Sequence, residues 1–217
     1  EDKGTWLVKG MKDRAYNRDR EQGNPTPFKQ VNRWFNSGGL GWGNLICFMS
    51  EQKRFKTGAL INTAIGYLKM RKRVLVIDFE NGETAITTRT EQSVMDTDQA
   101  TILSSSLDRR MMKLFRRYAR LKSELVIKRM VAYRDSKATI QAFIQKLKQE
   151  DGLIFDIVIV DYADLAASTT GVTDDTKRIS DVYVDLKNLG EEEHLEAVYT
   201  ASHVTRKASE ARMATKY

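Results

Sequence analysis

Five short apolar runs, separated by stretches with helical spacing of apolar residues, organise the chain from residue 45 onward. The runs are LICFMS (45–50), VLVIDFE (74–80), LVIKRM (125–130), DIVIVDY (156–162) and AVYTAS (197–202). They are continuous rather than alternating, which is typical of strands buried on both faces of a parallel sheet. Between them, apolar residues recur every three or four positions, as at Ile140, Ile144 and Leu147, which predicts helices. The pattern predicts an α/β fold, with a mostly parallel sheet and helices on both faces.

Polar residues follow four of these runs at the point where each predicted strand ends. Right-handed crossovers bring the carboxyl ends of parallel strands to one edge, where ligands of open α/β sheets bind. The first run leads into 50–57, the second ends with Asp78 and Glu80, the fourth with Asp161, and the fifth with His203. Each residue alone matches many unrelated loops, but their order and spacing together favour a ligand site.

The segment SEQKRFKT (50–57) has the layout of a phosphate-binding loop, G-x-x-x-x-G-K-[ST], placed between a strand and a helix. We expect Lys56 to contact the β- and γ-phosphates of ATP, and the Thr57 hydroxyl to coordinate Mg²⁺. Ser50 and Phe55 occupy the two glycine positions. The sequence therefore predicts a nucleotide site with an unusual loop.

The rest of this loop is expected to bind phosphate through its backbone. N–H groups from Gln52 to Thr57 can face a phosphate if the turn avoids left-handed angles at Phe55, because a side chain there disfavours positive φ. Lys53 and Arg54 add positive charge. We expect nucleotide binding, followed by hydrolysis.

Three further residues complete the expected chemistry. Asp161 closes an apolar strand, a suitable place for a carboxylate that holds the magnesium shell. Glu80, on a neighbouring strand, is expected to orient or deprotonate the attacking water. His203 is expected to contact the γ-phosphate.

Composition places the chain among globular intracellular proteins. It has 217 residues, of which 41% are hydrophobic and 30% charged, and its net charge is +7. The single Cys47 excludes a disulfide framework and favours a cytoplasmic location. No apolar stretch has transmembrane length, so we expect no membrane partner. We predict a polar arm at 1–24 and one domain at 25–217.

A basic balance is compatible with nucleic acid as a partner, and two kinds of segment compete for that role. The run DRRMMKLFRRYARLK (108–122) predicts a basic helix, which we interpret as a solvated or subunit-contacting face. The segments 167–177 and 205–216, which follow the fourth and fifth strands, are better candidates for DNA contact. Neither contains an aromatic residue for base stacking, which favours contact with the DNA backbone.

Four stretches resemble the motor domain of DnaB-like replicative helicases, particularly those of large tailed bacteriophages. NPTPFKQVNRWFNSGGLGWGNLICFMS (24–50) is similar to the entry to the first core strand, and VLVIDFENGETAITTR (74–89) to the second strand with its catalytic glutamate and a following helix that carries an arginine. FDIVIVDYADL (155–165) is similar to the magnesium-binding strand, and YTASHVTRKASEAR (199–212) to the sensor strand and nucleic-acid loop. The resemblance covers 25–217.

This resemblance implies a RecA-like P-loop NTPase core that forms a hexameric ring, binds ATP and Mg²⁺ between subunits and translocates on single-stranded DNA. It implies that Glu80 is the catalytic base and that His203 takes a sensor position usually held by glutamine. Arg206 and Lys207 would begin a DNA-contacting loop that also contains Arg212. Primase is an implied partner, and the cytoplasm of a phage-infected host the implied location.

Two alternatives stay open at this point. One is a RecA- or clock-type ATPase that forms rings or filaments without unwinding DNA. The other is a catalytically silent nucleotide-binding subunit that serves assembly, because the loop lacks both glycines. We also expect the chain to be a fragment, with the arginine finger and an amino-terminal assembly domain lying outside it.

Overall fold

The computed structural model describes residues 23–35, 37–102, 108–172 and 174–203. The chain divides into two compact units, Glu1–Gly41 and Trp42–Tyr217. The first contains helix α2 (Lys29–Asn32). The second contains, in chain order, β1 (Asn44–Ser50), α3 (Lys56–Lys69), β2 (Arg73–Asp78), α4 (Glu83–Met95), α5 (Gln99–Ile102), α6 (Asp108–Arg120), β3 (Glu124–Arg129), α7 (Lys137–Asp151), β4 (Ile157–Asp161), the 3₁₀ helix η2 (Ala163–Leu165), α8 (Asp175–Glu192) and β5 (Ala197–His203).

The five strands form one parallel sheet, as the continuous apolar runs predict. The strand order is β1-β5-β4-β2-β3, and every pairing is parallel. Each strand begins and ends within two residues of its predicted run. Register pairing places Ser50 opposite His203 and Asp78 opposite Asp161, so the polar residues of four strands meet at one edge.

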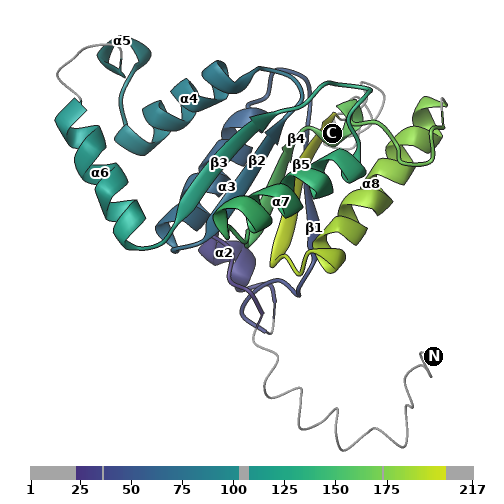
Figure 1. Ribbon diagram of the computed structural model, residues 1–217, viewed down its shortest axis with the longest axis horizontal. Coiled ribbons are helices and arrows are strands. Elements are labelled where there is room, and N and C mark those ends of the chain that lie inside the picture. Colours follow the sequence, from purple (N-terminus) through teal and green to yellow (C-terminus); the bar gives the residue numbers. More distant parts are fainter. Residues whose placement is uncertain (1–22, 36, 103–107, 173, 204–217) are drawn as a thin grey trace, which may run out of the picture. The chain divides into compact units, whose positions relative to one another are not determined.

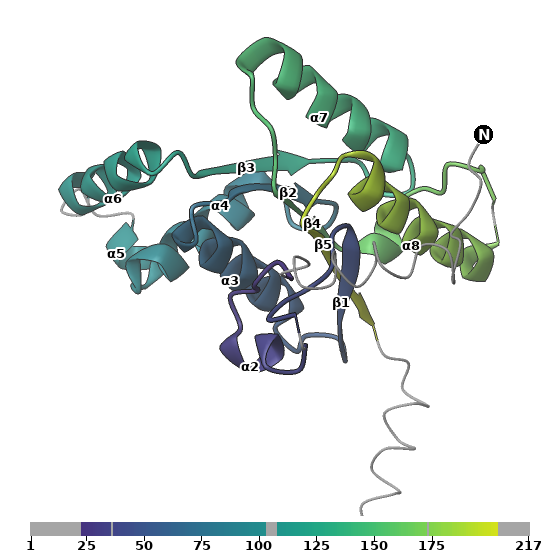
Figure 2. The ribbon, with the colours of Figure 1, turned by 90° about the horizontal axis from the view of Figure 1, so that it is seen from below.

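Helices cover both faces of the sheet, which confirms the predicted α/β class. Figures 1 and 2 show α7 and α8 on one face, and α3 with α4 on the other. Helix α6 lies near the β3 edge in both views. In the parts of the chain that the structure describes, no helix is long and apolar enough to span a membrane.

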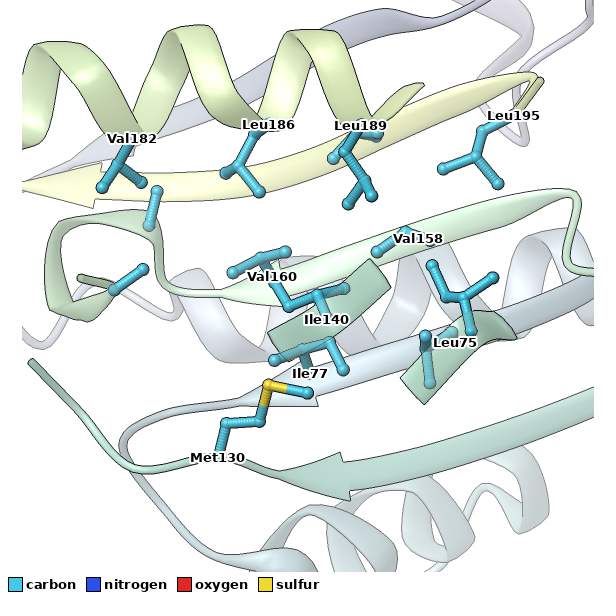
Figure 3. Packing of buried hydrophobic residues seen from close by; sticks show 14 of the residues in the cluster. Leu75, Ile77, Met130, Ile140, Val158, Val160, Val182, Leu186, Leu189 and Leu195 are labelled. Carbon is cyan, nitrogen blue, oxygen red and sulfur yellow. The ribbon is translucent and has the colours of Figure 1, made fainter. Parts of the chain in front are cut away.

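The larger core lies between the sheet and α7 and α8 (Figure 3). Alternate residues of the inner strands point into it, and the helices supply the opposite wall. Its labelled members are Leu75, Ile77, Met130, Ile140, Val158, Val160, Val182, Leu186, Leu189 and Leu195. Burying both faces excludes polar residues from strand interiors, and this is why the strands could be recognised from apolar runs alone.

The opposite face packs against α3. Leu60, Ala64 and Tyr67 of this helix are buried, and the Tyr67 hydroxyl lies 2.8 Å from the Tyr199 hydroxyl of β5. Because α3 begins directly after the loop that follows β1, this packing fixes the position of its amino-terminal end. The helix therefore presents its first turn at the edge where the polar strand ends meet.

The first unit is a small turn structure. Asn24 and Leu40 form an antiparallel bridge, and the Asn32 side chain hydrogen-bonds the Thr26 backbone N–H and carbonyl, each at 2.8 Å. A Cβ on Gly39 would lie 2.2 Å from the Asn24 carbonyl oxygen. Only glycine at this position lets the two segments approach so closely.

Candidate active site

A cavity of about 780 Å³ lies at the carboxyl edge of the sheet, beside the start of α3. The loop after β1, the segment after β2, the first turns of α3 and the outer side of α4 form its walls. The lining includes eight residues that the sequence predicts as functional: Gln52, Lys53, Arg54, Phe55, Lys56, Thr57, Glu80 and His203. These residues come from three separate segments, and the fold brings them to one space.

The loop between β1 and α3 has left-handed backbone angles at two residues with side chains. Lys53 has φ of 61° and Phe55 has φ of 62°. The expectation that the turn avoids left-handed angles at Phe55 is therefore wrong. The chain must curl within a few residues to pass from strand to helix, and this curl needs positive φ whether or not glycine is present. Each left-handed residue with a Cβ costs about 1 kcal/mol.

The Lys56 ammonium group joins the loop to the end of β5. Its Nζ donates hydrogen bonds to the carbonyl oxygens of Ser50 at 3.2 Å and Glu51 at 2.9 Å. It also lies 2.9 Å from His203 Nδ1. An ammonium group can only donate, so His203 accepts at Nδ1 and carries its proton at Nε2. The predicted phosphate-binding lysine and the predicted sensor are thus in direct contact.

The first turn of α3 is suited to bind an anion. The first N–H groups of a helix have no partner within the helix and carry the positive end of its dipole. In α3 the first intrahelical bond runs from the Ala59 N–H to the Phe55 carbonyl at 3.0 Å. The N–H groups of Lys56, Thr57 and Gly58 precede it, next to the Lys56 charge, and this combination is favourable for phosphate.

Two buried carboxylates lie side by side beneath the cavity, at the ends of β2 and β4. Asp78 is 0% exposed and Asp161 is 2% exposed. Asp78 accepts hydrogen bonds from the backbone N–H groups of Asn81 and Gly82. It therefore shapes the turn that follows β2 and carries Glu80.

Asp161 is less well satisfied. Burial raises its pKa from 3.8 to about 6, helped by the negative charges of Asp78 and Glu80, while a hydrogen bond from the Thr57 side chain opposes this rise. Asn81 Nδ2 reaches Asp161 Oδ2 at 3.5 Å. Asp161 Oδ1 is buried and has no hydrogen-bond partner among the described residues.

This arrangement fits a magnesium ion held through its water shell. An unsatisfied carboxylate oxygen beside a threonine hydroxyl offers the hard oxygen ligands and acceptors that Mg²⁺ and its waters need. Thr57 and Asp161 would supply them. The described residues contain no cluster of three or more His, Cys, Asp or Glu side chains that could form a metal site by themselves, so the substrate phosphates would have to complete the coordination.

Asn81 is a site residue that the sequence pattern predicts only as part of an Asn81-Gly82 turn. In the structure, Asn81 contacts both buried carboxylates, and its Oδ1 accepts a hydrogen bond from Arg89 of α4 at 3.1 Å. Asn81 therefore links the acidic strand ends to the positive charge of Arg89 on the cavity wall. The turn signal is visible in the sequence, but this bridging role depends on the distant strand β4.

The expected DNA-contacting residues Arg206, Lys207 and Arg212 lie outside the described residues. The basic run at 108–122 forms α6 and the turn after it, and its arginines line a wide groove on the surface of the α4–α6 edge. None of these basic residues lines the cavity beside α3.

The model of one protein family, DnaB-like helicase C terminal domain, matches residues 23–216. The chain belongs to this family. No curated protein matches the sequence.

Two similar solved structures share the fold. One is a DnaB-like replicative helicase, studied together with its interactions with primase: TM-score 0.74, 17% identity, covering 97% of this chain and 51% of the other. The other is a solved ATPase domain: TM-score 0.71, 17% identity, covering 95% of this chain and 74% of the other. The chain thus spans about half the length of the first. The likeness confirms the RecA-like fold that the sequence resemblance implied.

Proposed function

We propose that this DnaB-like domain is the ATP-hydrolysing motor of a replicative DNA helicase. The observation that carries the proposal is the contact between Lys56 and His203 on the wall of a cavity that Thr57 and Glu80 also line. A phosphate-binding lysine, a magnesium-binding hydroxyl, a carboxylate and a γ-phosphate sensor are the groups that hydrolysis of a nucleoside triphosphate requires.

Each group has a distinct role in this proposal. Lys56 and the first N–H groups of α3 bind the β- and γ-phosphates. Glu80 is exposed at the cavity, orients the attacking water and accepts its proton. Thr57 and Asp161 hold Mg²⁺, which neutralises developing charge on the phosphate oxygens when it is bound. His203 is positioned to contact the γ-phosphate through the same nitrogen that now accepts from Lys56.

Family membership supports the partners. We infer a homo-oligomeric ring, with six subunits as in the implied family architecture, acting on single-stranded DNA in the cytoplasm of a phage-infected host. Arg206, Lys207 and Arg212 would contact the DNA backbone. Primase is a further inferred partner, because one structurally similar helicase was studied with its interactions with primase.

The decisive test is ATP hydrolysis by the full chain with and without single-stranded DNA, using Lys56→Ala as the inactive variant. We expect hydrolysis stimulated by DNA, and loss of nucleotide binding by about 100-fold or more in Lys56→Ala, because a charge-assisted contact with phosphate disappears. Lys69→Ala is the matched control, since it removes an exposed lysine from the far end of the same helix. Equal turnover in wild type and Lys56→Ala would contradict the proposal.

A catalytically silent nucleotide-binding subunit is the second candidate. The left-handed angles at Lys53 and Phe55 favour it, since a loop strained in this way has lost the glycines that usually cradle phosphate. Tight ATP binding without turnover, with or without DNA, would select this candidate. Turnover without strand displacement from a forked substrate would instead indicate a RecA- or clock-type ATPase.

A further inference from the structure

The Phe55 ring is an exposed aromatic group on the wall of the nucleotide cavity. The side chain belongs to a residue that is 75% exposed, on a loop where Lys53, Arg54 and Lys56 are all charged. A backbone contact with phosphate needs no side chain at this position. The proposed hydrolysis therefore leaves the ring without a role.

The ring lies against Gly58 in the first turn of α3. A Cβ on Gly58 would lie 2.3 Å from Cε1 and from Cζ of Phe55. Any other residue at 58 would displace the ring, because real side chains do not approach so closely. The position of the ring thus depends on two residues together, Phe55 and Gly58.

This pair is locally unfavourable for folding. Phe55 is in a left-handed conformation, which disfavours residues with a Cβ, and Gly58 occupies a helical position where alanine would be more favourable. Local strain that persists on a cavity wall is a reason to look for function.

The ring is next to the groups that would bind phosphate. Gly58 is two residues beyond Lys56, and its N–H belongs to the same first turn of α3. A ligand with a phosphate on this turn would have its next chemical group within reach of the ring. In a nucleoside triphosphate that group is the ribose with its base. A phenyl ring stacks on bases and packs on sugars, whereas it forms no hydrogen bond with phosphate.

We propose that the Phe55 ring is a specificity-determining contact with the nucleoside part of a nucleoside triphosphate, held in place by the absence of a side chain at Gly58. The proposal rests on the proposed nucleotide site. It means that the loop replaces the backbone freedom of a glycine with an apolar contact outside the phosphates.

The test compares two ligands in Mg²⁺-containing buffer, ATP and inorganic tripolyphosphate, by calorimetric titration of the full chain. Only ATP has a nucleoside. The affinity ratio between the two ligands isolates the ring, since any change in the phosphate cradle affects both. Phe55→Asn removes the ring but keeps a residue that tolerates left-handed angles. Phe55→Tyr keeps the ring and is the matched control.

We expect the ratio of ATP affinity to tripolyphosphate affinity to fall about five- to tenfold in Phe55→Asn, the size of a lost stacking contact, and to stay within about twofold in Phe55→Tyr. Gly58→Ala should lower the same ratio, because its Cβ displaces the ring. An unchanged ratio in Phe55→Asn, with tight ATP binding by the wild type, would overturn the inference and leave the proposed function standing. The inference would also fall if Phe55→Asn bound both ligands more tightly by the same factor, since the ring would then be an obstruction. Failure of the wild type to bind ATP would instead overturn the proposed function itself.

Discussion

The ends of β2 and β4 carry equivalent residues in different environments. Asp78 and Asp161 are paired across the two strands, and both are buried. Asp78 is surrounded by donors from the turn that follows it. Asp161 has one buried oxygen without a partner among the described residues, and its pKa is raised to about 6.

This difference separates a structural carboxylate from one suited to a ligand. A buried charge with its hydrogen bonds made stabilises the fold, whereas a buried charge without them costs free energy. Asp78 therefore belongs to the architecture of the turn. Asp161 is better explained as a residue retained for what binds above it.

The largest effect should come from the residue that the Asp78 turn presents to the cavity. We expect Glu80→Gln to lower ATP turnover by about 10²- to 10⁴-fold, because glutamine cannot accept a proton from water. ATP affinity should change little, since Glu80 does not contact the loop after β1 in the proposed complex. Steady-state turnover and equilibrium binding measure the two effects separately.

Glu83→Gln is the control for loss of charge on the same turn. Its carboxylate accepts a hydrogen bond from the Arg129 N–H at 3.0 Å and does not line the cavity. We expect turnover close to wild type for Glu83→Gln. Normal hydrolysis by Glu80→Gln would show that another group is the base.

Removing the structural carboxylate should cost the most stability. We expect Asp78→Ala to lower the free energy of unfolding by about 3 kcal/mol, because the N–H groups of Asn81 and Gly82 would lose a charged acceptor in a buried place. Urea denaturation measures the change. Ser136→Ala, which removes the cap of α7, provides the scale at about 1 kcal/mol. A loss for Asp78→Ala no larger than this would mean that the turn holds without the carboxylate.

The parallel sheet could be predicted from the sequence because burial on both faces leaves a direct record in the residues. Runs such as 157–160 have no alternative environment that tolerates four consecutive apolar residues so well. The meeting of Lys56 with His203 could also be predicted, since parallel strands bring their carboxyl ends together whatever residues follow them. Here topology alone places the groups.

The loop conformation and the difference between the two aspartates could not be predicted. A left-handed angle at Phe55 contradicts the local preference of phenylalanine, and only the demands of the strand-to-helix passage impose it. Asp78 and Asp161 look alike in sequence, since each follows an apolar strand. Their environments differ through Asn81, which lies 80 residues from Asp161 along the chain.

The unsatisfied carboxylate should show the opposite sign to Asp78. We expect Asp161→Asn to raise the free energy of unfolding by about 1 to 2 kcal/mol at pH 7 in buffer with EDTA, because it removes a buried charge. The folded pKa of about 6 lies above the ordinary value of 3.8. The destabilisation by Asp161 is therefore absent below about pH 4, grows as pH rises to 6, and is complete above it.

The gain from Asp161→Asn should accordingly disappear at pH 4, which urea denaturation at both values would show. A gain of the same size at both would mean that burial of the charge is not its cause. A loss of stability at pH 7 would mean that Asp161 is a structural carboxylate like Asp78, and the contrast between the two strand ends would be wrong.

The smallest expected effect concerns the strained loop, which resembles Asp161 in being unfavourable for folding. We expect Phe55→Gly to raise the free energy of unfolding by about 1 kcal/mol, since glycine adopts a φ of 62° without steric cost. Phe55 is mostly exposed, so little packing is lost. Phe55→Ala is the matched control: it removes the ring but keeps the Cβ, and should bring no such gain. Equal stability of the glycine and alanine variants would show that the loop relaxes to right-handed angles, and the strain would then have no part in holding the ring against Gly58.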